Sequence, residues 1–227
     1  MIKYSEAYNF IISWLTRQSE FSGFRWDKKE KTFIKKTDFG LNIVDLYGTE
    51  SFDLENDVLA FSIEPYYNVR FNIVHDWFID YSHKRKSDLK YSYTVALPHM
   101  HWNTFKSPIL FRLEKRDDFD FDIRNKLPQV PEMCDKIFSH YNKLESLTSL
   151  LIDPIEQEGV NALPHVGIDW VFERLALILI TRPAQFDDLE KIVYSRLEEM
   201  YNDGEPNALL YFHKYPEILN ALKSIQF

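Results

Sequence analysis

Hydrophobic and polar residues alternate most regularly between Asn68 and Tyr81. Every second residue from Val69 to Tyr81 is apolar or aromatic, with His75 among them, and most intervening positions are polar. Val74 and Phe78 are the exceptions. A period of two is typical of a strand that turns one face to a core. The pattern therefore predicts a half-buried strand over 68–81.

A second run, YSYTVALPHMHW (91–102), alternates in the same way but less regularly. The segment between the two runs makes an antiparallel hairpin the simplest connection. Pairing Tyr81 with Tyr91 near the turn would place His75 diagonal to His99 on the neighbouring strand.

Shorter runs of the same kind predict the rest of a sheet. They are KTFIKKT (31–37), LNIVDLYGT (41–49), VLAFSIE (58–64) and ILFRLEK (109–115). Proline lacks the N–H that a strand interior needs, so we expect Pro65 to end the third of these strands.

Helical spacing precedes and follows this region. Apolar residues recur every three or four positions from Ser5, a plausible N-cap, to about Gln18. After Pro128 the spacing is helical again, over 131–152, 169–180, 183–202 and from Pro206 onward. Strands followed by helices indicate an α+β fold with an N-terminal helix, an antiparallel sheet of about five or six strands and a helical C-terminal region. We expect residues 1–128 to form the helix and sheet, and 129–227 to pack on them or to form a subdomain.

Composition narrows the classes of function. The chain has 35 acidic and 27 basic residues and a net charge of −8, which argues against a nucleic-acid binder. The longest strongly apolar run, LALILI (175–180), is too short to span a bilayer. Cys134 is the single cysteine and excludes an intrachain disulfide. We therefore expect a soluble cytoplasmic protein that binds neither nucleic acid nor membrane.

The histidines of the predicted hairpin are the candidate metal ligands. His99 and His101 share a face because strand side chains have period two, and His75 joins them if the register above holds. Three imidazoles on one face suit zinc or another divalent transition metal. The same face is apolar, however, so the alternative is a structural role in which these histidines are hydrogen-bonded groups at the end of the core. The sequence favours this alternative, which assigns no cofactor.

Two further segments contain residue types found in functional sites, but each predicts a site less strongly than the histidines do. Asp118, Asp120 and Asp122 have the spacing of a calcium loop, but Ile123 and Gln129 stand where that loop needs glycine and glutamate. A solvated acidic turn is the better interpretation of 114–125. Cys134 lies near a predicted helix start, where a thiol is either a nucleophile or a small core residue. The familiar glycine-rich nucleotide and serine-hydrolase motifs do not occur.

The segments GFRWDKKEKTFIKK and FGLNIVDLYG follow the first helix in an order that resembles uncharacterised bacterial α+β families. Some members of those families are thought to be immunity proteins for secreted toxins. The resemblance covers roughly the first half of the chain and transfers no catalytic residue. It implies binding rather than catalysis.

Three functions remain open on these grounds. The leading one is an intracellular, immunity-like binding protein whose acidic character favours a basic protein partner. The rival is a metal-dependent hydrolase in which His75, His99 and His101 hold the metal that activates water. A pocket for an apolar ligand among the aromatic residues is the third.

Overall fold

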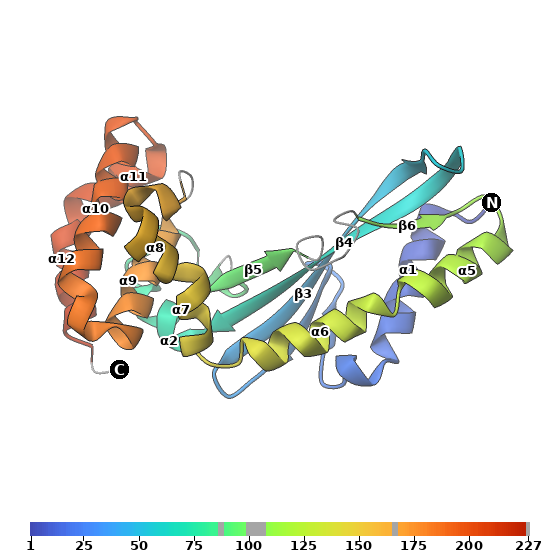
Figure 1. Ribbon diagram of the computed structural model, residues 1–227, viewed down its shortest axis with the longest axis horizontal. Coiled ribbons are helices and arrows are strands. Elements are labelled where there is room, and N and C mark those ends of the chain that lie inside the picture. The colour runs from blue at the N-terminus through green and yellow to red at the C-terminus, as the bar shows by residue number, and fades with distance from the viewer. Residues whose placement is uncertain (86–88, 99–107, 165–167, 226–227) are drawn as a thin grey trace. The chain divides into compact units, whose positions relative to one another are not determined.

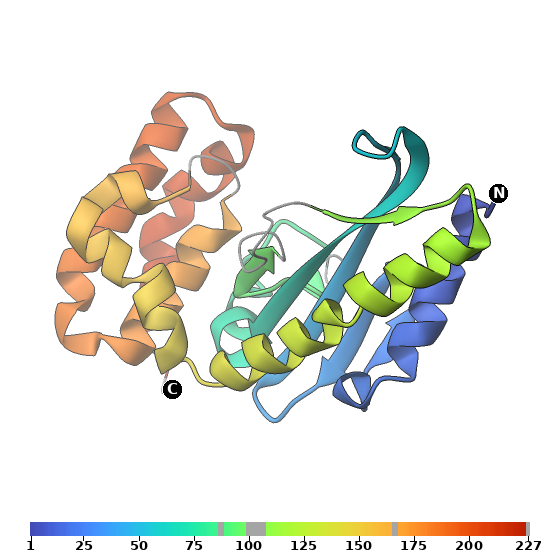
Figure 2. The ribbon, with the colours of Figure 1, turned by 45° about the vertical axis from the view of Figure 1, so that its right-hand side comes forward.

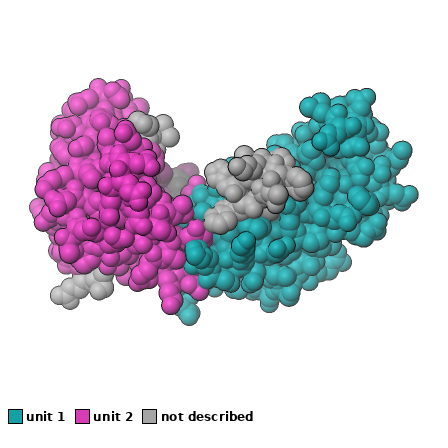
Figure 3. All heavy atoms as spheres, in the orientation of Figure 1, with its two compact units in different colours: residues 1–69, 95–140 teal, residues 70–94, 141–227 magenta. Residues whose placement is uncertain are grey.

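The computed structural model describes residues 1–85, 89–98, 108–164 and 168–225. The chain forms two compact units, coloured teal and magenta in Figure 3. Unit 1 comprises Met1–Val69 and Val95–His140, and unit 2 comprises Arg70–Thr94 and Tyr141–Phe227. This division differs from the predicted break after residue 128, because residues 129–140 belong with the sheet and 70–94 belong with the C-terminal helices.

Unit 1 is built on a six-stranded antiparallel sheet, and the chain has the predicted α+β fold (Figure 1). The strand order is β1-β2-β3-β4-β5, with β6 also paired to β4. The strands are β1 (Arg25–Asp27), β2 (Thr32–Lys36), β3 (Gly40–Asp53), β4 (Val58–Phe71), β5 (Val95–Pro98) and β6 (Ile109–Arg112).

Three helices cover one face of this sheet (Figures 1 and 2). They are α1 (Tyr4–Thr16), α5 (Arg116–Lys126) and α6 (Gln129–His140), and a short 3-10 turn, η1 (Ser19–Phe21), follows α1. Ser5, the expected N-cap, lies inside the first turn of α1. Aromatic rings fill the layer between helices and sheet, with Phe119 against Phe111 and Phe138 against Tyr67. Large rings dominate core energetics, so these contacts hold the two layers together.

Gly48 allows α1 to approach the sheet. A Cβ atom at this position would lie 2.7 Å from Cζ of Phe61, closer than Cβ atoms approach other atoms in proteins, and a tight 3.2 Å from Cε2 of Tyr8. The hydroxyl of Tyr4 donates to the carbonyl of Gly48 at 2.6 Å, and that of Tyr8 donates to the carbonyl of Leu46 at 3.2 Å. Glycine at 48 is therefore required by packing.

Strand β4 continues through Pro65, so the prediction that this proline ends a strand is wrong. The reason lies in its neighbours. β6 pairs with residues 60–63 of β4, and β5 pairs with residues 66–69. Pro65 falls between the two partners, where its missing N–H removes no ladder hydrogen bond.

The predicted strand over 68–81 is correct only as far as Phe71. β4 ends at Phe71, and the chain turns into the helix α2 (Asn72–His75) and the 3-10 turn η2 (Asp76–Phe78). The expected hairpin register fails with it, because β5 pairs with β4 so that Val69 faces Val95. Beyond Phe71 the buried positions are Val74, His75 and Phe78, which is helical spacing.

Unit 2 is helical apart from its share of β4. The predicted helix over 131–152 is divided into α6 and α7, and the chain passes from unit 1 to unit 2 between them. None of the helices in the described ranges is long and apolar enough to cross a membrane. The C-terminal elements are α7 (Glu145–Leu151), α8 (Asp153–Glu158), η3 (Gly159–Ala162), α9 (Asp169–Thr181), η4 (Pro183–Gln185), α10 (Phe186–Asn202), α11 (Pro206–Tyr211), η5 (Phe212–Lys214) and α12 (Tyr215–Lys223).

The acidic segment 114–125, expected to be a solvated turn, lies mostly in α5 and contains a fully buried carboxylate. Asp122 accepts hydrogen bonds from the backbone N–H of Arg112 at 2.9 Å and from two of its guanidinium nitrogens at 3.0 Å. Nζ of Lys126 lies 3.0 Å from Oδ1 of the same carboxylate. Burial acts to raise the pKa of Asp122, but the hydrogen bonds from Arg112 and Lys126 outweigh it, so this pKa is lowered.

Replacing Asp122 with asparagine is expected to lower the free energy of unfolding by about 3 kcal/mol, because Arg112 loses its buried counter-charge. Urea unfolding at pH 7 measures this loss. Asp118→Asn is the matched control, since Asp118 is more exposed and lies 3.7 Å from Arg112, and it should change stability little.

Wild type and Asp122→Asn also test how the stabilisation by Asp122 depends on pH. Because the pKa of Asp122 is lowered by folding, its stabilisation is complete above the unfolded value of about 3.9 and is lost as the pH falls through the folded pKa. The stability difference between wild type and Asp122→Asn should therefore shrink below about pH 4. A difference that stays constant to pH 2 would contradict this account.

Candidate functional site

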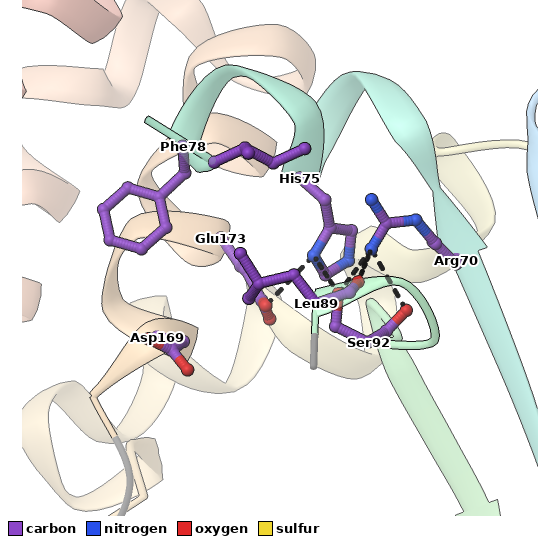
Figure 4. Close-up of a pocket in the computed structure, with 8 residues that line it drawn as sticks. Arg70, His75, Phe78, Leu89, Ser92, Asp169 and Glu173 are labelled. Atoms are coloured by element: carbon purple, nitrogen blue, oxygen red, sulfur yellow. Dashed lines mark hydrogen bonds and ion pairs between the residues drawn. The ribbon is translucent and has the colours of Figure 1, made fainter. Parts of the chain in front are cut away.

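His75, the one predicted metal ligand that the structure describes, ends α2 and is buried in unit 2, where it is 6% exposed (Figure 4). Its Nε2 lies 3.0 Å from the hydroxyl of Thr94, and its Nδ1 lies 3.1 Å from a carboxylate oxygen of Glu173 in α9. The hydroxyl of Ser92 is 3.3 Å from the same Nδ1.

The donors and acceptors around His75 form a consistent chain. The backbone N–H of Phe71 donates to the hydroxyl oxygen of Thr94 at 3.0 Å, and the Thr94 hydroxyl can in turn donate its proton to Nε2 of His75. Nδ1 then carries the ring proton and donates it to Glu173. Both ring nitrogens are engaged, so in this arrangement neither offers a lone pair to a metal. The geometry is that of a hydrogen-bonded core histidine.

Arg70 lies beside the histidine and is also buried (Figure 4). Its guanidinium donates to the carboxylate of Asp76 at 2.8 Å, to the carbonyl of Leu89 at 3.2 Å and to Ser92. The space that these side chains enclose with α9 is about 10 Å³, the size that holds one water molecule. The cluster therefore joins segments of unit 2 and leaves no room for a substrate.

The three-histidine prediction has a mixed outcome. His99 and His101 lie outside the described residues, so the metal site remains a prediction. The prediction that His75 lies on a strand and shares a face with His99 and His101 is wrong, because His75 lies on the helix α2. Within the described ranges, no group of three or more histidine, cysteine, aspartate or glutamate side chains is arranged to hold a metal ion.

Replacing His75 with leucine should destabilise unit 2 by about 2–3 kcal/mol, because the mostly enclosed carboxylate of Glu173 would lose its hydrogen-bond donor. His75→Asn is the milder control, since its amide N–H can still reach Glu173. Hydrogen exchange of the α2 and α9 amides measures the effect locally. Unchanged exchange in His75→Leu, combined with loss of a bound metal, would support a ligand role instead.

Cys134 lies on α6 with its side chain buried. Burial raises the pKa of the Cys134 thiol to about 12. The thiol stays protonated at neutral pH, so it is a core group and lacks the thiolate that a nucleophile needs.

Several large apolar side chains are exposed at the end of the β3–β4 hairpin in unit 1. Phe52 is 43%, Leu54 86% and Leu59 45% exposed. The tip bends away from α1 and α5 in both ribbon views (Figures 1 and 2). Phe52 and Leu59 thus extend the apolar face of the sheet past the helices that cover the rest of it.

A groove of about 450 Å³ adjoins these residues. Its lining includes Met1 and Ile2 of the N-terminal segment, Glu50 and Leu59 of the hairpin, and Leu113. The backbone N–H of Ile2 donates to the carbonyl of Leu113 at 2.7 Å, which ties the N-terminal segment to the sheet. The groove is open, apolar in lining and contained within unit 1.

The hairpin tip is held in a defined turn. The carboxylate of Asp53 accepts the backbone N–H groups of Glu55 and Asn56 and the side-chain amide of Asn56 at 2.8 Å. Burial acts to raise the pKa of Asp53, but these hydrogen bonds outweigh it and the pKa is lowered. A fixed turn presents the exposed side chains without a large ordering cost.

The tip is also acidic. Segment 50–57, ESFDLEND, contains four acidic and no basic residues. Glu50, Glu55 and Asp57 are exposed. We define the hairpin surface as Phe52, Leu54 and Leu59 together with these three carboxylates. Sequence reasoning missed it, although two isolated apolar residues among carboxylates, between two predicted strands, were a usable signal.

Comparison with known proteins adds no constraint. The chain matches no family model, no curated protein and no solved structure. The geometry of the described residues is therefore the basis for inferring a function.

Proposed function

We propose that this protein is a protein-binding module that docks a basic protein partner on the hairpin surface. The observation that carries the proposal is the exposure of Phe52, Leu54 and Leu59 on a fixed hairpin next to an open apolar groove.

Apolar side chains of this size rarely gather on a surface without a use. A contiguous exposed patch with a polar rim is typical of a protein-interaction site. Aromatic residues and methionine are enriched in such interfaces, and Phe52 and Met1 supply both here. A rigid turn lowers the conformational entropy that binding would otherwise cost.

The carboxylates of the hairpin surface favour a partner with positive charge. Glu50, Glu55 and Asp57 are exposed and close in the chain to the apolar residues, and the whole chain carries a net charge of −8. Complementary charge accelerates encounter and disfavours partners of like charge. A partner with lysine or arginine around an apolar anchor fits this surface.

The resemblance to suspected immunity proteins points to the same class of function, and neutralisation of a basic toxin is one form of it. The metal-dependent hydrolase built on His75, His99 and His101 remains a prediction, and no observation on the described residues favours it.

Site-specific photo-crosslinking tests the proposal. p-Benzoylphenylalanine is placed at Leu54, on the hairpin surface, and in a control protein at Leu209, a half-exposed leucine on α11 in unit 2. We expect the Leu54 protein, expressed in its native host, to yield an adduct with a basic protein that the Leu209 protein does not yield. Adduct yield should fall at high salt, because exposed charges are screened.

A separate variant tests whether binding requires the negative charge of the hairpin surface. Replacing Glu50, Glu55 and Asp57 with their amides should lower adduct yield at Leu54 several-fold without changing the melting temperature. Adducts formed equally from Leu54 and Leu209, or only with acidic proteins, would contradict the proposal.

A further inference from the structure

The β3 strand is longer than the neighbour on its outer side. β2 pairs with β3 from Leu41 to Asp45, whereas β3 continues to Asp53. Past residue 45, β3 is therefore an edge strand on the side away from β4. An exposed edge presents backbone N–H and C=O groups that can pair with another chain.

The outward-facing residues of this edge can be identified. The backbone N–H of Leu46 donates outward to Lys31, and its carbonyl accepts from Tyr8. The carbonyl of Gly48 accepts from Tyr4 on the same side. Every second residue of an antiparallel strand faces the same neighbour, so Glu50 and Phe52 face outward next.

The edge is thus protected in part. Two tyrosine hydroxyls satisfy the carbonyls of Leu46 and Gly48. On the side away from β4, no described strand pairs with β3 at Glu50 or Phe52, and no described side chain bonds their outward backbone groups. Both residues are exposed. The unprotected stretch coincides with the hairpin surface.

We propose that an extended basic segment of the partner adds to the sheet as a strand, hydrogen-bonded to the backbone of Glu50 and Phe52. This inference rests on the proposed function and specifies how the partner binds. Backbone pairing supplies affinity that depends little on sequence, while alternate side chains supply specificity.

The side chains of Glu50 and Phe52 indicate what the added strand carries. Residues opposite each other in an antiparallel pair contact one another. A lysine or arginine opposite Glu50 and an apolar residue opposite Phe52 would match the charge and hydrophobicity of the edge. An alternating basic and apolar segment is the expected partner sequence.

A synthetic peptide provides a probe. Acetyl-Lys-Val-Lys-Ile-Lys-Val-amide is titrated into the ¹⁵N-labelled protein, with the same peptide N-methylated at valine and isoleucine as the control. We expect shift changes and slowed amide exchange at Glu50 and Phe52, and little change in exchange at Ser51, whose N–H faces β4. The N-methylated peptide should not produce them. Equal responses to both peptides, or none at millimolar peptide, would overturn strand addition.

A pair of variants separates this inference from the proposed function. Glu50→Pro removes the outward N–H while leaving the bonds to β4, and Glu50→Gln removes the same charge but keeps the N–H. Glu50→Pro should bind the peptide about tenfold more weakly than Glu50→Gln, given the loss of at least one hydrogen bond and of the strand geometry.

The crosslink at Leu54 then distinguishes failure of strand addition from failure of the proposed function. An adduct that forms as well in Glu50→Pro as in Glu50→Gln would refute strand addition and leave the proposed function standing. Absence of a Leu54-specific adduct in the otherwise unchanged protein would refute the proposed function itself. Unfolding midpoints of both variants, expected to lie close together, show that the hairpin is intact.

Discussion

The packing of Phe61 over Gly48 is the constraint on which unit 1 depends. The ring occupies the space in which any other residue at position 48 would place a Cβ atom. Tyr4 and Tyr8 of α1 meet the same ring edge-on, and Phe111 of β6 lies beside it. One contact therefore sets the distance between helix and sheet and brings β6 to β4. It also brings the tyrosine hydroxyls to the edge of β3, where they bond the carbonyls of Leu46 and Gly48. The outward backbone groups of Glu50 and Phe52 are not covered in this way.

Unit 2 depends on a polar arrangement instead. His75 and Arg70 connect the segment after β4, the segment before β5 and α9 through hydrogen bonds to Thr94, Ser92 and Glu173. A buried polar network of this kind holds one geometry, because an unsatisfied member costs more than a missing apolar contact. The histidine that attracts a catalytic interpretation in the sequence has a structural environment in the fold.

The sequence predicted the helices and most strands because their periods are local properties. It failed at 68–81 because alternation continues past the end of β4 by coincidence. Val74 and Phe78, the two exceptions to the alternation, are buried residues of the helical turns and were the evidence against a strand. Asp122 could not be recognised as buried, because its partner Arg112 comes from a strand and only tertiary structure brings the two together. The candidate surface was missed for the same reason: which apolar residues stay exposed depends on where the covering helices end.

The discontinuous make-up of the two units has a consequence for dissecting the protein. The chain crosses between them after Val69, Thr94 and His140. A protease cut at any one of these crossings would leave the units joined by the remaining two. Residues 141–227 expressed alone would lack His75, and Glu173 would lose its hydrogen bond from the ring. Neither unit can therefore be exchanged between proteins as a single uninterrupted stretch of gene, and recombination that respects this fold must move both segments of a unit together.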